Sequence, residues 1–199
     1  MDREEAQKAL ELLRTVVKQA RDDSALQNWG PIWILHGLTN AAGFIATDVM
    51  IVRGVERAWL FALLWLGVVG GNLAAVVLLK ARGTGARSFV ENQLWSIWMT
   101  FIFANAALGV LNSLMGLPLL TLAPVIGILS AVGFSMMGAL MGARWYLGSV
   151  IFVLTAFAMA VVPRWQFALL GVVWGVAQCA GGVWLTLEKR RHTSDARIV

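Results

Sequence analysis

The sequence predicts an all-α fold, a polytopic membrane protein whose six-transmembrane-helix bundle is preceded by a cytoplasmic amphipathic helix. The mean hydropathy of the 199 residues is +0.73 and only 14% of them are charged, whereas soluble domains carry about 25% charged residues. Apolar runs of about 18 residues or more recur along the chain, with charges gathered in short clusters between them. This distribution is typical of a multi-pass membrane protein.

Residues 2–23 are predicted to form the amphipathic helix. Its apolar residues recur at intervals of three and four and therefore form one stripe, made of Ala6, Leu10, Leu13, Val17 and Ala20. Six acidic residues in the same segment oppose binding to an anionic lipid surface. We therefore expect Leu10, Leu13 and Val17 to form a docking face for a cytoplasmic protein partner or for a second copy of the chain.

Six membrane helices are predicted after this segment, near residues 32–52, 58–79, 89–115, 119–143, 145–162 and 165–187. Gly30-Pro31 begins the first of them, and a capping box from Ser88 to Glu91 begins the third. The connections are short, so consecutive helices should be antiparallel neighbours. The chain divides into a cytoplasmic helix (1–30), a membrane domain (31–188) and a basic cytoplasmic tail (189–199).

The distribution of basic residues predicts the orientation in the membrane. If the N-terminus is cytoplasmic, thirteen Lys and Arg residues lie in inner segments and three in outer loops, which agrees with the positive-inside rule. We therefore expect a protein of the cell (inner) membrane with both termini in the cytoplasm. The basic residues flank apolar segments, so membrane topology accounts for the pI of about 10.1. No nucleic-acid partner is therefore expected. Eight of the ten tryptophans lie near predicted helix ends and are interpreted as interfacial anchors.

Several polar residues fall inside the predicted membrane helices at a similar depth. Asn40, Asn72, Ser135 and Gln178 lie seven to nine residues from the predicted inner helix ends, or about 10–14 Å deep at the helical rise. His36 lies on the same helix face as Asn40, one turn closer to the cytoplasm. These five residues either hydrogen-bond helices together or line a small solvated pocket open to the cytoplasm.

Asp48 lies off the stripe shared by His36 and Asn40, about four residues from the outer end of the first helix. One interpretation is an interfacial carboxylate that reaches lipid headgroups or pairs with Arg53. The other is a protonatable group in an outer vestibule with Asn112, since carboxylates inside membranes are functional candidates. Asp48 and His36 lie at opposite depths, so a joint catalytic or metal site is not expected.

The sequence has no motif that indicates an enzyme. HExxH, GxSxG, paired intramembrane aspartates and a histidine pair for haem are all absent, so no catalytic residue, cofactor or metal site is predicted. Besides the lipid bilayer, the expected partner is the one bound through residues 2–23. The predicted function is therefore a non-enzymatic regulatory or accessory role through the N-terminal helix. The alternative is a small-solute transporter, or a membrane substrate-binding subunit, that uses the inner polar layer.

Overall fold

Six long helices make up the body of the protein. The computed structural model describes residues 5, 7, 8, 10–12, 29–80 and 89–195. The helices are α2 (Gly30–Val52), α3 (Ala58–Lys80), α4 (Phe89–Leu114), α5 (Leu122–Met141), α6 (Tyr146–Val161) and α7 (Gln166–Asp195). Three short 3-10 turns precede α5, α6 and α7, at Leu119–Thr121, Ala143–Trp145 and Pro163–Trp165. The described residues contain no strand, so the prediction of an all-α fold is confirmed.

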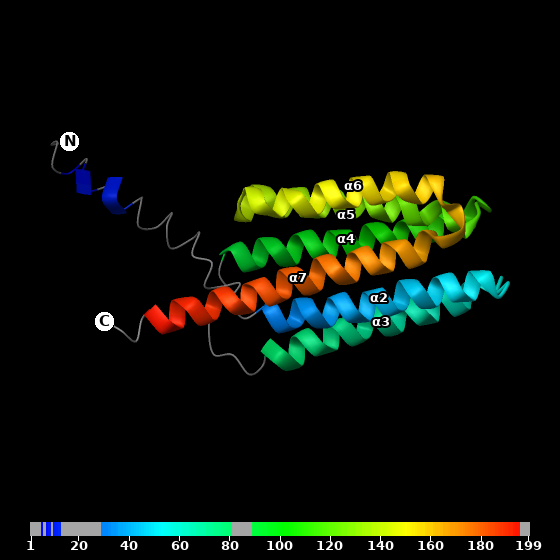
Figure 1. Ribbon diagram of the computed structural model, residues 1–199, viewed down its shortest axis with the longest axis horizontal. Helices are drawn as coiled ribbons and strands as arrows, with labels where there is room; N and C mark the ends of the chain where they lie inside the picture. Colours follow the sequence, from blue (N-terminus) through cyan, green and yellow to red (C-terminus); the bar gives the residue numbers. More distant parts are fainter. Residues whose placement is uncertain (1–4, 6, 9, 13–28, 81–88, 196–199) are drawn as a thin grey trace.

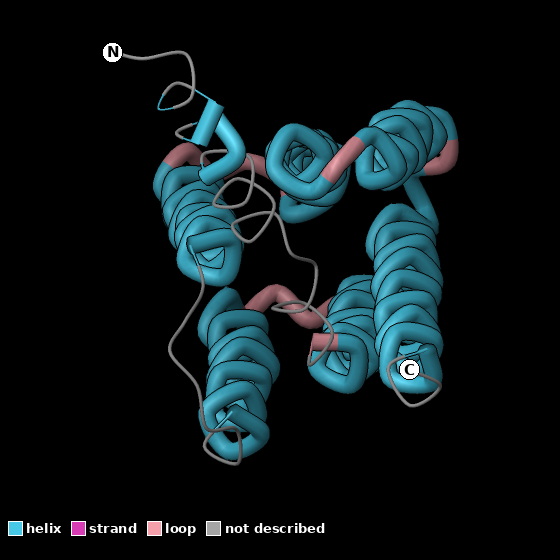
Figure 2. The backbone as a smooth tube through the Cα atoms, turned by 90° about the vertical axis from the view of Figure 1, so that its left-hand side faces the viewer, coloured by secondary structure: helices cyan, strands magenta, loops and turns pink. Residues whose placement is uncertain are grey.

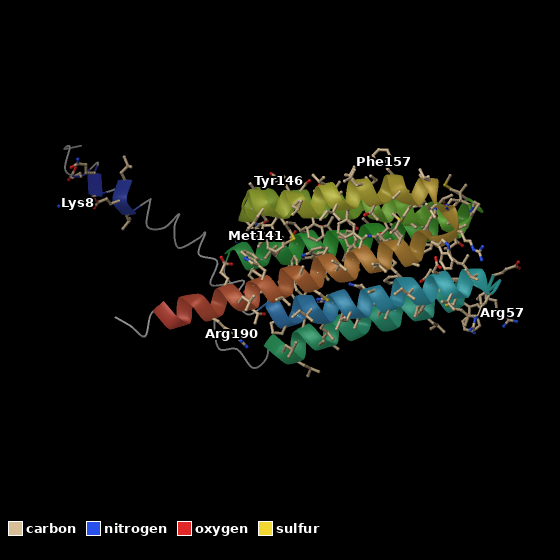
Figure 3. The ribbon with its side chains drawn as sticks, in the orientation of Figure 1. Lys8, Arg57, Met141, Tyr146, Phe157 and Arg190 are labelled. Carbon is tan, nitrogen blue, oxygen red and sulfur yellow. The ribbon has the colours of Figure 1, made fainter. Side chains whose placement is uncertain are left out.

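Each of the six helices is long and apolar enough to cross a membrane. The candidate spans are 19 to 26 residues long, and about 20 apolar residues cross a bilayer. In Figure 3, Phe157 points away from the bundle, while Arg57 and Arg190 lie at opposite ends of it. Phe157 is 69% exposed, like many other apolar side chains on the outer faces of the helices. This arrangement is compatible with a multi-pass membrane protein whose outer faces contact the lipid bilayer.

Consecutive helices run antiparallel, as the short connections predicted (Figure 1). The start of α2 and the end of α7 lie at one end of the bundle, which we term the terminal end. The α2–α3, α4–α5 and α6–α7 turns lie at the opposite end, which we term the distal end. The side of the membrane that each end faces stays a prediction from the charge distribution.

The helices are arranged around a ring when the bundle is viewed along its length (Figure 2). Neighbours in contact follow the order α3, α2, α7, α6, α5 and α4, and the α2–α7 and α5–α6 pairs are the most extensive. Among the six helices, α3 and α4 have the smallest fraction of residues buried inside the bundle. The interior is therefore built mainly by α2, α5, α6 and α7, with α3 and α4 packed at the two ends of the series.

The observed helix ends lie within three residues of the predicted ones except at the end of α7. That helix continues to Asp195, beyond the predicted end near 187, because the residues after Glu188 include lysine and arginine, which favour a helix outside the bilayer too. Gly142, which follows α5, has φ +111°, a backbone conformation that side chains other than glycine rarely adopt. The turn into α6 therefore depends on glycine at this position.

The predicted N-terminal helix is only partly described. Residues 5, 7, 8 and 10–12 are helical, and the rest of the 2–23 segment lies outside the described residues. The amphipathic helix therefore stays a prediction.

Candidate functional site

The close approach of α2 and α7 positions the interior side chains. A Cβ atom at Gly182 would lie 2.6 Å from the carbonyl oxygen of Gly30 and 2.9 Å from the backbone nitrogen of Ile34. A Cβ atom at Gly37 would lie 2.9 Å from the Cβ atom of Gln178. Small residues allow membrane helices to pack backbone against backbone. The glycines of these two helices therefore bring the interior faces of α2 and α7 together over much of their length.

Two residues of the predicted polar layer meet between α2 and α3. The Asn72 carboxamide donates from Nδ2 to Oδ1 of Asn40 at 3.3 Å. The hydroxyl of Thr39 donates to Oδ1 of Asn72 at 2.6 Å. Asn72 is 6% exposed, so lipid and bulk water have little access to it. These three neutral side chains form a hydrogen-bonded cluster, which we term the α2–α3 cluster.

The structure places the other three residues of the predicted layer elsewhere. Ser135 on α5 lies with its hydroxyl 2.8 Å from the hydroxyl of Ser149 on α6. Gln178 is buried in the α2–α7 interface beside Gly37. His36 is half-buried on α2, and no hydrogen bond joins its side chain to the α2–α3 cluster. The polar residues thus lie at three different helix interfaces.

The two residues of the predicted outer vestibule have separate partners. Asp48, which is 4% exposed, accepts a hydrogen bond at Oδ1 from the backbone N–H of Ala168, 3.2 Å away. Asn112 donates from Nδ2 to the carbonyl oxygen of Leu117 and accepts at Oδ1 from the hydroxyl of Thr121. Asp48 therefore joins α2 to α7, and Asn112 closes the turn between α4 and α5. Arg53, the other predicted partner of Asp48, is exposed after the end of α2.

The predicted docking face is described at one position. Leu10 is exposed, as is Leu12, which lies off the predicted stripe. Leu13 and Val17 lie outside the described residues. The docking role of this face therefore stays a prediction.

A continuous aromatic core is the main interior feature that the sequence analysis missed. The Trp33 ring contacts the rings of Trp98, Phe134 and Trp145, with centroids 4.9–6.3 Å apart. The chain of ring contacts continues through Trp98 to Trp174, 6.3 Å away. Trp29, Trp33, Trp145 and Trp174 are buried. The interpretation of Trp29, Trp33 and Trp145 as interfacial anchors is therefore wrong, because helix packing places them inside the bundle.

One sequence signal pointed toward this core. Trp98, Phe101 and Asn105 are spaced by three and four residues, which places them on one face of α4. Phe101 and Trp98 both contact the Trp174 ring, at 5.4 Å and 6.3 Å between centroids. Offset or edge-to-face pairs of aromatic rings contribute about 0.5–1.5 kcal/mol beyond burial of their area. The core therefore links α4 to α7 across the interior of the bundle through side-chain contacts.

Arg144 joins the connection between α5 and α6 to the terminal half of α7. Its guanidinium lies 3.9 Å above the ring of Trp184, and Nη1 lies 3.7 Å from Oε1 of Glu188. A cation over an indole contributes about 0.5–1 kcal/mol at an exposed site and about 2 kcal/mol where it is desolvated, and Trp184 is half-buried. The arrangement therefore restrains the α5–α6 turn at the terminal end of the bundle.

The polar groups of the described interior are suited to hold helices in register. The interior hydrogen bonds of the described residues are made mainly by hydroxyl, carboxamide and backbone groups, with Asp48 as a buried carboxylate. Within residues 29–80 and 89–195, no group of three or more His, Cys, Asp or Glu side chains is placed to hold a metal ion. No model of a known protein family matches the chain, and neither a curated protein nor a solved structure matches it.

Proposed function

We propose that this multi-pass membrane protein has a non-enzymatic, regulatory or accessory role, exerted through its N-terminal segment on the cytoplasmic side. The bundle serves as the membrane anchor, and the stripe of Leu10, Leu13 and Val17 binds the partner. In this proposal the helix bundle holds the protein in the bilayer, and the N-terminal segment binds the partner.

The observation that supports this proposal most is the use of the interior polar groups. The carboxamides of Asn40 and Asn72 bond one another, and the Asp48 carboxylate is engaged by the backbone of α7. A polar side chain that binds a solute needs a free hydrogen-bonding atom when the solute arrives. A polar side chain that joins two helices keeps its hydrogen bond within the protein. The exposed Leu10 side chain supplies an apolar contact outside the bundle.

Site-specific photo-crosslinking in cells tests the proposal. The photoreactive residue p-benzoylphenylalanine replaces Leu10 in one variant and Leu12 in a matched control, since both leucines are exposed but only Leu10 belongs to the stripe. We expect one discrete adduct from position 10 and none from position 12. An adduct of twice the mass of the chain identifies a second copy as the partner. Equal patterns of adducts from both positions contradict the proposal.

The second candidate is a small-solute transporter or substrate-binding subunit, which is favoured by the burial of Asn72 and Gln178 within the bundle. A solvated pathway from the cytoplasm would reach Asn72 but not Phe61, which is buried near the opposite end of α3. In a Cys179→Ser background, Asn72→Cys and Phe61→Cys are treated with a water-soluble maleimide. Selective labelling of Asn72→Cys supports transport. Protection of both cysteines supports the anchoring role of the bundle.

A further inference from the structure

The contacts between α2 and α7 keep a single antiparallel register from the middle of the bundle to its distal end. A Cβ atom at Gly37 would lie 3.2 Å from the backbone nitrogen of Cys179. Eleven residues later on α2, Asp48 accepts the hydrogen bond of Ala168, which lies eleven residues before Cys179 on α7. Each advance along α2 is thus matched by an equal step back along α7.

This register brings two arginines to the same place at the distal end. Arg53 follows Asp48 by five residues and lies directly after α2. Arg164 precedes Ala168 by four residues, in the 3-10 turn before α7. Both arginines are exposed, and no ion pair joins either of them to a carboxylate within the described parts of the chain. Two neighbouring like charges repel one another, so an anion between them is favoured.

The charges at the distal end are few and mostly positive. Its three turns carry three arginines and one acidic residue, namely Arg53, Arg57, Arg164 and Glu56. Arg57 lies directly before α3, which packs on α2 but is not among the main neighbours of α7. The planar guanidinium of arginine forms two parallel hydrogen bonds with a phosphate group. The chemistry of the arginine pair beside α7 therefore suits a phosphate.

We propose that Arg53 and Arg164 bind the phosphate group of an anionic phospholipid at the distal end of the α2–α7 pair. Each guanidinium donates hydrogen bonds to the phosphate oxygens, and the anion offsets the repulsion between the two cations. The Arg164 guanidinium carbon lies 5.4 Å from the centroid of the Trp165 ring. Trp165 is 50% exposed, and exposed tryptophans at helix ends lie at the level of the lipid headgroups.

Apolar side chains next to the two arginines fit the acyl chain of such a lipid. On α2, Ile45 and Val49 precede Arg53 at intervals of four residues and so lie on the same side of the helix. On α7, Val172 follows Trp165 by seven residues, or about two turns. The exposed fractions of these three aliphatic side chains are 42–54%. A zwitterionic lipid should bind less well, because its own cation lies close to the arginines.

Native mass spectrometry of the full chain, released from detergent micelles, tests the site. The probe is phosphatidylglycerol, and phosphatidylcholine with the same acyl chains is the control lipid. We expect phosphatidylglycerol to bind more tightly. Arg53→Gln and Arg164→Gln should each weaken its binding about tenfold, the effect of one lost hydrogen bond to a charged group. Arg57→Gln removes one charge from the same end of the bundle and should leave the affinity within about twofold, since this residue lies outside the pair.

Two results would overturn the proposal: equal binding of both lipids to the wild type, or equal losses in all three variants, which indicates a general effect of surface charge. Both arginines of the pair are exposed, so the glutamine variants should elute as the wild type does in size-exclusion chromatography. If Arg53→Gln does not fold, Arg53→Lys keeps the charge without the planar fork and should still weaken binding. Inorganic phosphate as a competitor distinguishes the two sources of the anion. Retention of the lipid supports the phospholipid, and displacement supports a free phosphate ion bound by the same arginines.

Discussion

Asp48 of α2 accepts a hydrogen bond from the backbone N–H of Ala168, in the first turn of α7, at 3.2 Å. The first N–H groups of a helix have no partner within the helix, and the helix dipole favours a negative charge beside them. A side chain from the same chain segment usually caps a helix, but here the cap comes from a helix 120 residues earlier in the sequence. The contact therefore fixes the distal ends of α2 and α7 relative to one another.

Replacement of Asp48 should lower the stability of the protein more when the hydrogen-bond acceptor is removed than when only the charge is removed. Asp48→Leu, which removes the acceptor at similar volume, should reduce the free energy of unfolding by about 1–3 kcal/mol, the cost of a buried unpaired N–H. Asp48→Asn keeps an acceptor oxygen and should cost about 0.3–1 kcal/mol, the worth of a charge at a helix terminus. Denaturant titration in mixed micelles measures both. Equal stabilities of wild type and Asp48→Leu would show that the cap is not energetically coupled to folding.

Glycine substitutions should distinguish the α2–α7 interface from the outer face of α3. Gly182→Ala places a methyl group 2.6 Å from the carbonyl oxygen of Gly30, and such overpacking costs about 1–3 kcal/mol. At Gly67 a Cβ atom would meet nothing within 4 Å, so Gly67→Ala should cause no loss. The midpoint of thermal unfolding, followed by size-exclusion chromatography of heated samples, compares the two. Similar midpoints for both variants would contradict the backbone-to-backbone packing of α2 and α7.

The bond between Asn40 and Asn72 should appear as an energetic coupling. A double-mutant cycle of Asn40→Ala and Asn72→Ala should give a coupling free energy of about 0.6 kcal/mol, the average for hydrogen bonds between membrane helices. Asn72→Ala combined with Ser149→Ala serves as the control pair, since distant sites without shared partners are additive. The free energy of unfolding of each variant is measured. A coupling no larger than that of the control pair would remove the α2–α3 cluster from the interactions that stabilise the bundle.

Truncation of Trp33 should be far more costly than truncation of a lipid-facing tryptophan. Trp33 is 3% exposed and contacts three other aromatic rings, so Trp33→Ala should cost about 3–5 kcal/mol through lost burial and the cavity that remains. Trp59 is 54% exposed, and Trp59→Ala should change stability by no more than about 0.5 kcal/mol. Denaturant unfolding, followed by far-UV circular dichroism, measures both effects. A small loss for Trp33→Ala would mean that the aromatic core is loosely packed.

Local properties of the chain predicted the helices well. Hydropathy and length identified all six, because the bilayer demands about 20 apolar residues in each span and backbone groups satisfied within it. Gly30-Pro31 marked the start of α2, since proline lacks the N–H that a first turn leaves unpaired. The antiparallel order followed from the short connections alone.

The partners of the polar residues required the packed bundle. Depth grouped Asn40, Asn72, Ser135 and Gln178 into one layer, but each helix also has a rotation about its axis that depth does not constrain. Packing turns Asn40 toward Asn72 and Ser135 toward Ser149, so the layer divides. The interfacial interpretation of Trp29, Trp33 and Trp145 was wrong for a similar reason. A residue near a helix end lies at the membrane interface only if its side chain also faces outward.

The sequence by itself determined the number, approximate membrane spans, order and alternating direction of the six helices, because the bilayer acts on each segment independently. Only the tertiary structure decided which faces meet. The glycines of α2 and α7 permit those two backbones to touch, and that contact sets the positions of the neighbouring helices. A shift of one residue rotates a helix face by 100°, enough to exchange a partner across an interface for lipid. The pairing of Asp48 with α7, and of Trp174 with the aromatic core, therefore depends on the whole bundle.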